Sequence, residues 1–230
     1  MKFQIENMAF ELPASTLLTG PMAAAKPIFA QKFMVEWIRN GGKVSYFATS
    51  SPIDGVISNL KVLGLDEKMM DKITFFDYNP KLREIEKIGR GYAGNFSNEK
   101  QLKEALNMVN DSIVVIPSFT LLLVGIEDKK ALASVLIKNL FEKDITSFVA
   151  VNSAMFKEVN KMLEEKADNI LEFIKKEDGI YIKVKKFKGE TAFKEWLFEF
   201  PMHLFHRTKK EVAERTAKLI KEKKGKNFKK

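Results

Sequence analysis

The sequence contains no cysteine, only two histidines, and no long uninterrupted apolar run. The absence of cysteine excludes disulfides, thiol nucleophiles and cysteine-ligated metals. His203 and His206 are too few for a histidine-rich site, so we expect no bound metal ion. No apolar segment approaches the roughly 20 residues that span a bilayer. The first residues, MKFQIENMAF, also lack the apolar stretch of a signal peptide, so we expect a cytoplasmic protein without a membrane partner.

Positive charge is the sequence's main excess, and it is concentrated at the C-terminus. The formal net charge is +9, and residues 207–230 contribute eleven Lys or Arg and three Glu, which is +8 and leaves +1 for the rest. We therefore expect a core domain at 1–206 and a basic helix with a disordered tail at 207–230. The candidate nucleic-acid contacts in this segment are Lys218, Lys221, Lys223 and Lys224. Glutamates at helical spacing from its lysines are also typical of an ordinary solvated helix, so both interpretations stay open.

Short β-rich apolar runs alternate with helical patterns along most of the chain. Strands are expected at residues 15–19, 43–48, 73–76, 111–117 and 147–151. Helices are expected at residues 28–40, 54–63, 99–109, 129–142 and 154–166. Three further β segments follow at residues 169–173, 179–187 and 196–200. This order predicts a three-layer α/β fold with a mostly parallel central sheet and antiparallel strands at its C-terminal end.

The turn after the first expected strand partly matches a phosphate-binding loop. A P-loop reads GxxxxGK[ST] between a strand and a helix, and residues 20–27 read GPMAAAKP. Gly20 and Lys26 have the required spacing. Ala25 and Pro27 stand where the second glycine and the hydroxyl residue belong.

The segments around this loop resemble the KaiC-like members of the RecA superfamily. The resemblance is carried by LPASTLLTGP (12–21), FAQKF (29–33), GGKV (41–44), NLKVLG (59–64), IVVIPS (113–118), ADNI (167–170) and VKKFKG (184–189). It covers most of residues 10–200 and implies a RecA-like P-loop NTPase fold. In the family, the strand resembling residues 113–116 ends in the Walker B aspartate, and Pro117 takes that place here. The family's acidic general base resembles positions 50 and 51, which are Ser50 and Ser51 here.

These departures predict that ATP hydrolysis is lost. Alanine in the left-handed conformation that the family's glycines supply costs about 1–2 kcal/mol, so Ala23 and Ala25 are expected to give the loop another shape. Pro27 removes a hydroxyl that would hold Mg²⁺ and an N–H that would face phosphate. Serine is no general base without a partner. The degenerate loop of Gly20, Ala25, Lys26 and Pro27 is therefore vestigial, and we expect no cofactor, or ATP bound only weakly.

Three functions remain open for such a protein. The first is a non-catalytic regulatory or scaffolding partner of another protein or of its own copies. The second is a nucleic-acid-binding module that uses the basic C-terminal segment. The third is a sensor that binds ATP through Gly20 and Lys26 without hydrolysing it. Lys186 and Lys188 resemble family residues that reach the nucleotide of an adjacent subunit, although alternating lysines also form the solvated face of ordinary strands.

Overall fold

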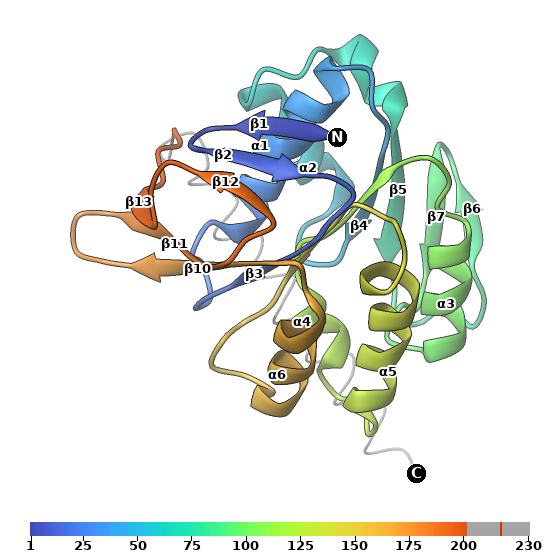
Figure 1. Ribbon diagram of the computed structural model, residues 1–230. Coiled ribbons are helices and arrows are strands. Elements are labelled where there is room, and N and C mark those ends of the chain that lie inside the picture. The colour runs from blue at the N-terminus through green and yellow to red at the C-terminus, as the bar shows by residue number, and fades with distance from the viewer. Residues whose placement is uncertain (202–216, 218–230) are drawn as a thin grey trace.

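The computed structural model describes residues 1–201 and Ala217 (Figure 1). The expected C-terminal basic helix and tail, with Lys218, Lys221, Lys223 and Lys224, lie outside the described residues apart from Ala217. So do His203 and His206. Among the described residues, no helix is long and apolar enough to cross a membrane.

A ten-stranded sheet runs through the middle of the molecule (Figure 1). Its strands in spatial order are β13 (Glu195–Leu197), β11 (Ile180–Lys186), β10 (Asn169–Lys175), β3 (Ser15–Thr19), β9 (Ser147–Ala150), β8 (Ile113–Ile116), β4 (Val44–Ala48), β5 (Ile73–Tyr78), β7 (Gly91–Gly94) and β6 (Glu86–Ile88). The seven strands from β10 to β7 are parallel to their neighbours. β11 and β13 continue the sheet antiparallel at one edge, and β6 does so at the other. The expected mostly parallel sheet with antiparallel C-terminal strands is confirmed.

Helices cover both faces of this sheet because its central strands are apolar on both sides. Along β3, Leu17 belongs to one buried cluster and Leu18 to the other, as the alternation of side chains in a strand requires. The cluster of Leu18 is covered by α1 (Lys26–Arg39) and α2 (Ile53–Val62). The cluster of Leu17 is covered by α3 (Glu99–Asn107), α5 (Lys129–Leu136) and α6 (Lys157–Lys166). The molecule thus has three layers, as expected.

Several elements differ from the sequence-based expectation. The helix expected at residues 129–142 is α5 followed by a π-helical turn, η2 (Ile137–Phe141). The helix expected from residue 154 begins at Lys157, because residues 152–156 form a loop. Four short elements outside the small N-terminal sheet were not expected: a 3-10 helix, η1 (Glu67–Lys72), α4 (Phe119–Leu123), and the strands β6 and β7 at the edge of the main sheet.

A small second sheet at the N-terminus was also not expected. It consists of β1 (Lys2–Ile5), β2 (Met8–Glu11) and β12 (Gly189–Thr191), and it lies beside α1 in Figure 1. Phe3 and Phe10 place their rings 4.9 and 5.3 Å from the ring of Phe33 on α1. The hairpin therefore closes the outer side of the α1 cluster. Its signal in the sequence was the alternation of Phe3 and Ile5, then Met8 and Phe10, around a polar turn.

Candidate functional site

The loop between β3 and α1 stands at the carboxyl edge of the sheet's centre. β3 lies between β10 and β9, and the loop follows directly from its last residue, Thr19. In open parallel sheets, ligands bind outside the carboxyl ends of the strands. α1 begins at Lys26 with Pro27 in its first turn, where proline's fixed φ suits a helix start.

The backbone of this loop keeps left-handed conformations at both alanines. Ala23 has φ 57° and Ala25 has φ 55°. The expectation that alanine would give the loop another shape is therefore wrong at these two residues. Strained conformations persist where the surroundings over-determine them. Here Ala24 and Ala25 are packed into the core, with 1% and 9% of their surfaces exposed, so the loop has little room to relax.

Gly20 is fixed in place by two neighbouring segments. Its φ is 140°, and a Cβ added to it would lie 2.4 Å from the carbonyl oxygen of Phe173 on β10. A side chain at this position is therefore excluded by the backbone of the adjacent strand. The carbonyl oxygen of Gly20 also accepts a hydrogen bond from the N–H of Ser153, at 3.1 Å, in the loop after β9.

The side chain of Lys26 folds back over the loop. Its Nζ donates hydrogen bonds to the carbonyl oxygens of Gly20, at 2.8 Å, and Pro21, at 2.6 Å. Only 6% of the residue is exposed. Burial lowers the pKa of Lys26 from 10.5 to about 8. The two carbonyl groups act in the opposite sense, because they stabilise the charged ammonium. Gly20, Ala25, Lys26 and Pro27 thus lie together in one loop, whose side-chain and backbone contacts are internal to it and to the neighbouring segments.

The N–H groups of the loop remain available for a ligand. Among the described residues, the backbone N–H groups of Met22, Ala23 and Ala25 have no hydrogen-bond acceptor. Met22 is 64% exposed, so the tip of the loop faces solvent. Consecutive N–H groups in alternating conformations form a concavity that suits anions. The loop therefore retains donors for a phosphate chain, although Pro27 contributes neither a hydroxyl nor an N–H.

Next to the loop, the ends of β4 and β8 carry no carboxylate at the three positions expected from the resemblance. Ser50 and Pro117 are buried there, and Ser51 is half-buried. Because β4 and β8 are adjacent parallel strands, their ends meet at one edge. The hydroxyl of Thr49 accepts a hydrogen bond from the N–H of Ser118 at 3.1 Å, which joins the two ends directly.

A second threonine joins the next pair of strands in the same manner. The hydroxyl of Thr120, just after β8, accepts a hydrogen bond from the N–H of Asn152 at 2.8 Å, just after β9. Asn160 on α6 donates to the carbonyl oxygens of Asn152 and Met155, both at 2.9 Å, and so fixes this loop. We did not identify Thr49, Thr120 or Asn152 from the sequence. Their signal was a small polar residue shortly after each buried strand.

Lys186 and Lys188 lie at the amino-terminal ends of the parallel strands, whereas Lys26 lies at their carboxyl ends. Lys186 pairs in register with Ile170, near the start of β10, whereas Gly20 lies beyond the end of β3. The Nζ of Lys186 donates to the carbonyl oxygen of Ala167, and that of Lys188 donates to Pro13 at 3.0 Å. Both side chains are thus engaged within their own chain and are not part of the loop site. Among the described residues, no three acidic or histidine side chains group as metal ligands.

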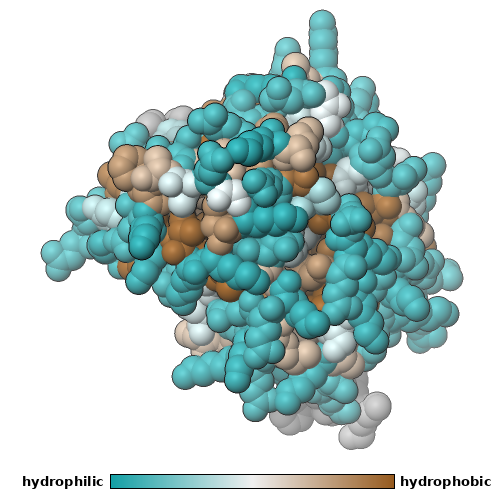
Figure 2. All heavy atoms as spheres, viewed as in Figure 1, coloured by the Kyte–Doolittle hydropathy of each residue, from teal (hydrophilic) through white to brown (hydrophobic). Residues whose placement is uncertain are grey.

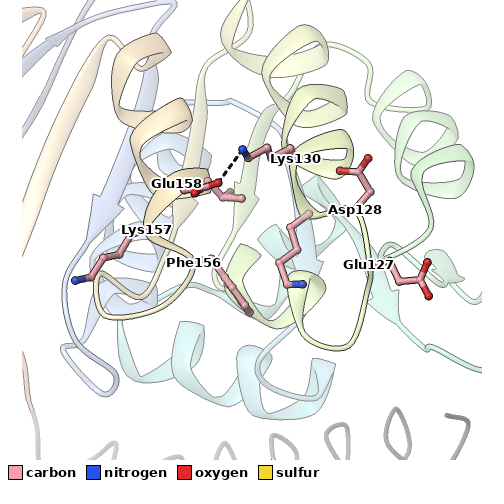
Figure 3. Close-up of a pocket in the computed structure, with 8 residues that line it drawn as sticks. Glu127, Asp128, Lys130, Phe156, Lys157 and Glu158 are labelled. Atoms are coloured by element: carbon pink, nitrogen blue, oxygen red, sulfur yellow. Dashed lines mark ion pairs between the residues drawn. The ribbon is translucent and has the colours of Figure 1, made fainter.

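A surface pocket of about 530 Å³ lies between the N-terminal ends of α5 and α6 (Figure 3). Lys130 and Glu158 pair across it at 2.7 Å. Their hydrogen bond raises the pKa of Lys130 and lowers the pKa of Glu158. The Nζ of Lys129 lies 5.5 Å from the ring centre of Phe156 and donates to the carbonyl oxygen of Ile126. The charged groups named here are satisfied by one another or by backbone, and no sequence pattern indicated this pocket.

Comparison with known proteins agrees with this architecture. A model of the KaiC ATPase family matches residues 5–188. The flagellar accessory protein FlaH from Methanocaldococcus jannaschii has a similar structure, with a TM-score of 0.61, 12% identity, and coverage of 81% of this chain and 84% of FlaH. The KaiC-like protein PH0186 from Pyrococcus horikoshii OT3 has a TM-score of 0.60, 18% identity, and coverage of 83% and 87%. No curated protein sequence matches the chain. The solved structures show that the fold is RecA-like, which confirms the fold that the resemblance implied.

Proposed function

The chain belongs to the KaiC family of ATPases, and from this premise we propose that it is a member that does not hydrolyse ATP and acts as a regulatory or scaffolding protein. Phosphoryl transfer to water needs a group that orients or deprotonates the water, and acidic and hydroxyl groups that hold Mg²⁺. Ser50 and Ser51 supply no base for the water, Pro117 supplies no acid for Mg²⁺, and Pro27 supplies no hydroxyl for it.

The observation that carries this proposal is the bonding at the strand ends. Thr49 and Thr120 use their hydroxyl groups to accept N–H groups of the neighbouring strand ends, at 3.1 and 2.8 Å. These neutral bonds hold the edge of the sheet together within the protein itself. An edge stabilised in this way requires no metal ion to organise it, which suits a protein that presents a fixed surface.

The test is ATP turnover by the purified protein with Mg²⁺, with the Lys26→Met variant as the matched control. We expect no difference between the two proteins. Lys26 is chosen because it is the charged side chain that the loop retains from the motif, and its Nζ lies on the carbonyl oxygens of Gly20 and Pro21 in the loop. Turnover by the wild-type protein that disappears in Lys26→Met would refute the proposal.

A sensor that binds ATP without hydrolysing it is the second candidate. It is favoured by the left-handed conformation of Ala23 and Ala25 and by the N–H groups of Met22, Ala23 and Ala25, which have no acceptor among the described residues. Backbone donors at a helix start bind phosphate without help from a metal. We therefore expect any ATP affinity to be the same with Mg²⁺ and with EDTA.

Calorimetric titration with ATP in these two conditions separates the candidates. Heat of equal size in both conditions supports the sensor. Absence of heat and of any thermal shift at millimolar ATP supports the regulatory or scaffolding protein alone. Binding that requires Mg²⁺ contradicts both, because it implies a metal site at this edge of the sheet.

A further inference from the structure

The segment Glu195–Phe200, here called the C-terminal strap, packs against α1 close to the loop. Phe198 is 3% exposed, and its ring lies 5.7 Å from that of Phe29 on α1 and 6.0 Å from that of Phe173 on β10, in edge-to-face contacts. Its N–H donates to the carbonyl oxygen of Ile180 at 2.7 Å. The strap is thus inserted into the α1 side of the core, not laid on its surface.

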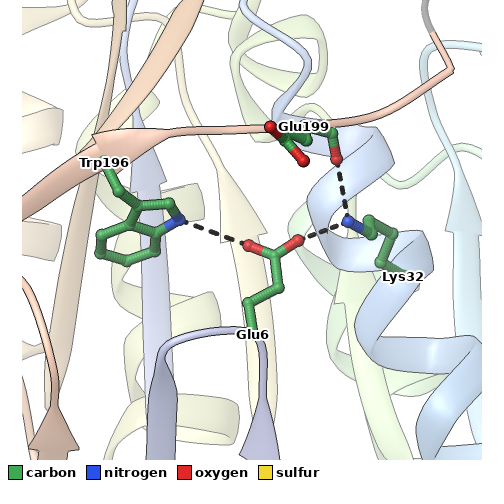
Figure 4. A network of polar contacts seen from close by, with 4 residues as sticks. All are labelled: Glu6, Lys32, Trp196 and Glu199. Carbon is green, nitrogen blue, oxygen red and sulfur yellow. Dashed lines mark hydrogen bonds and ion pairs between the residues drawn. The ribbon is translucent and has the colours of Figure 1, made fainter.

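A polar network fixes the strap to the next turn of α1 (Figure 4). Lys32 forms an ion pair with Glu6 and donates to the carbonyl oxygen of Glu199 at 3.0 Å. The indole N–H of Trp196 donates to the other carboxylate oxygen of Glu6 at 3.4 Å. The side chains of Lys32 and Glu6 are 27% and 18% exposed, so water screens this pair less than a surface pair. The strap therefore contacts α1 at two successive turns, through Phe29 and Lys32.

The partners of Phe198 also contact the loop. The N–H of Phe29 donates to the carbonyl oxygen of Ala25 at 3.2 Å. The carbonyl of Phe173 is the group that faces Gly20 and leaves no room for a side chain there. Gly20 in turn provides one of the two carbonyl groups that hold the Nζ of Lys26. A single layer of packed groups thus connects Phe198 to both ends of the loop.

We propose that Phe198 is a positioning residue for the loop: its insertion between Phe29 and Phe173 holds Lys26 buried on the loop carbonyls, and withdrawal of the strap releases it. The strap would then regulate the anion site of the loop. That the strap regulates an anion site rests on the function proposed above, whereas the coupling between Phe198 and Lys26 exists without a nucleotide.

The test measures how the Lys26 amine reacts with acetic anhydride as a function of pH, with peptide mass spectrometry as the readout. The wild-type amine is expected to titrate near its lowered pKa of about 8. In Phe198→Ala, water reaches the amine, so its apparent pKa is expected to rise by about 1 toward the ordinary lysine value, and its labelling rate is expected to increase. Phe198→Leu is expected to give a smaller change in the same direction and decides the question if Phe198→Ala does not fold.

The matched control is Phe96→Leu, which alters a fully buried ring in the cluster on the other face of the sheet. A loss of packing that only loosens the whole protein would change Lys26 equally in both leucine variants. The proposal is overturned if Phe96→Leu shifts the Lys26 profile as much as Phe198→Leu, or if neither Phe198 variant shifts it. Because no nucleotide is present, a failure here is separate from a failure of ATP binding in the titrations above.

Discussion

Replacing a left-handed alanine of the loop with glycine is expected to increase the free energy of unfolding, which is unusual for a substitution to glycine. Replacing Ala23 with glycine removes a conformational cost of about 1–2 kcal/mol from the folded state. The more flexible glycine stabilises the unfolded chain by about 0.4–1 kcal/mol. Ala23 is exposed, so its methyl group contributes little burial. The difference predicts that Ala23→Gly increases the free energy of unfolding by about 0.5–1 kcal/mol.

The neighbouring alanine provides the control. Ala24 is 1% exposed and lies outside the left-handed region. Ala24→Gly therefore loses a buried methyl group worth about 0.8 kcal/mol and incurs the same flexibility cost, which predicts a destabilisation of about 1–2 kcal/mol. Two adjacent and chemically identical substitutions are thus expected to have opposite signs.

Thermal unfolding of the three proteins measures both effects. For a chain of this size, 1 kcal/mol shifts the Tm by about 2–4 °C, so we expect Ala23→Gly to raise the Tm by about 2 °C and Ala24→Gly to lower it by about 4 °C. Urea unfolding gives the same comparison at 25 °C. The reasoning is refuted if Ala23→Gly lowers the stability as Ala24→Gly does, because Ala23 would then not adopt the left-handed conformation.

Three further predictions concern other parts of the chain. The pKa of Lys26 is about 8 in the folded state and 10.5 as the ordinary value, so the unfolded chain binds more protons than the folded protein between these pH values. The free energy of unfolding of the wild-type protein, relative to that of Lys26→Met, should therefore rise over this window by at most about 3 kcal/mol. Urea unfolding of both proteins from pH 7.5 to 10.5 checks this. Ser15→Ala removes a hydroxyl that donates to the carboxylate of Asp168 at 3.0 Å and accepts from its N–H, and should lower the free energy of unfolding by about 1–3 kcal/mol in urea. The alternative that residues 207–230 bind nucleic acid, left open by the sequence, requires salt-dependent DNA binding by the full chain in a gel shift and its loss when these residues are deleted; equal binding by both proteins would exclude a role of this segment.

The sequence was sufficient to predict the parallel sheet because the amino-acid composition of its central strands is typical of buried strands. β3 has the same bounds, Ser15–Thr19, as the strand expected from the apolar run between a turn and Gly20. The N-terminal hairpin was missed because each of its strands has only four residues and because β2 also pairs with a segment near residue 190. Such a pairing depends on tertiary contacts and leaves only a weak local pattern.

The candidate site was predictable in its residues and not in its geometry. The spacing of Gly20 and Lys26 located the loop, but nothing local indicates that the Lys26 amine turns back onto Gly20 and Pro21. Local preference argued against left-handed alanines, and packing of Ala24 and Ala25 overrode it. The bond from Ser118 to Thr49 joins residues 69 positions apart, a distance over which a single sequence carries no signal.

If hydrolysis is absent, as proposed above, we expect that no single substitution restores it. Mg²⁺ needs both a hydroxyl at position 27 and an acid at position 117, and water needs a base at position 50 or 51. The effects on catalytic rate of groups that act as a unit are strongly non-additive, so restoring one group alone adds almost nothing to the rate. Pro27→Thr, Pro117→Asp and Ser50→Glu are each expected to leave ATP turnover at background, because the metal or the base is still missing. Turnover in any one of these single variants, measured beside Lys26→Met, would mean that the wild-type site already contains the other groups.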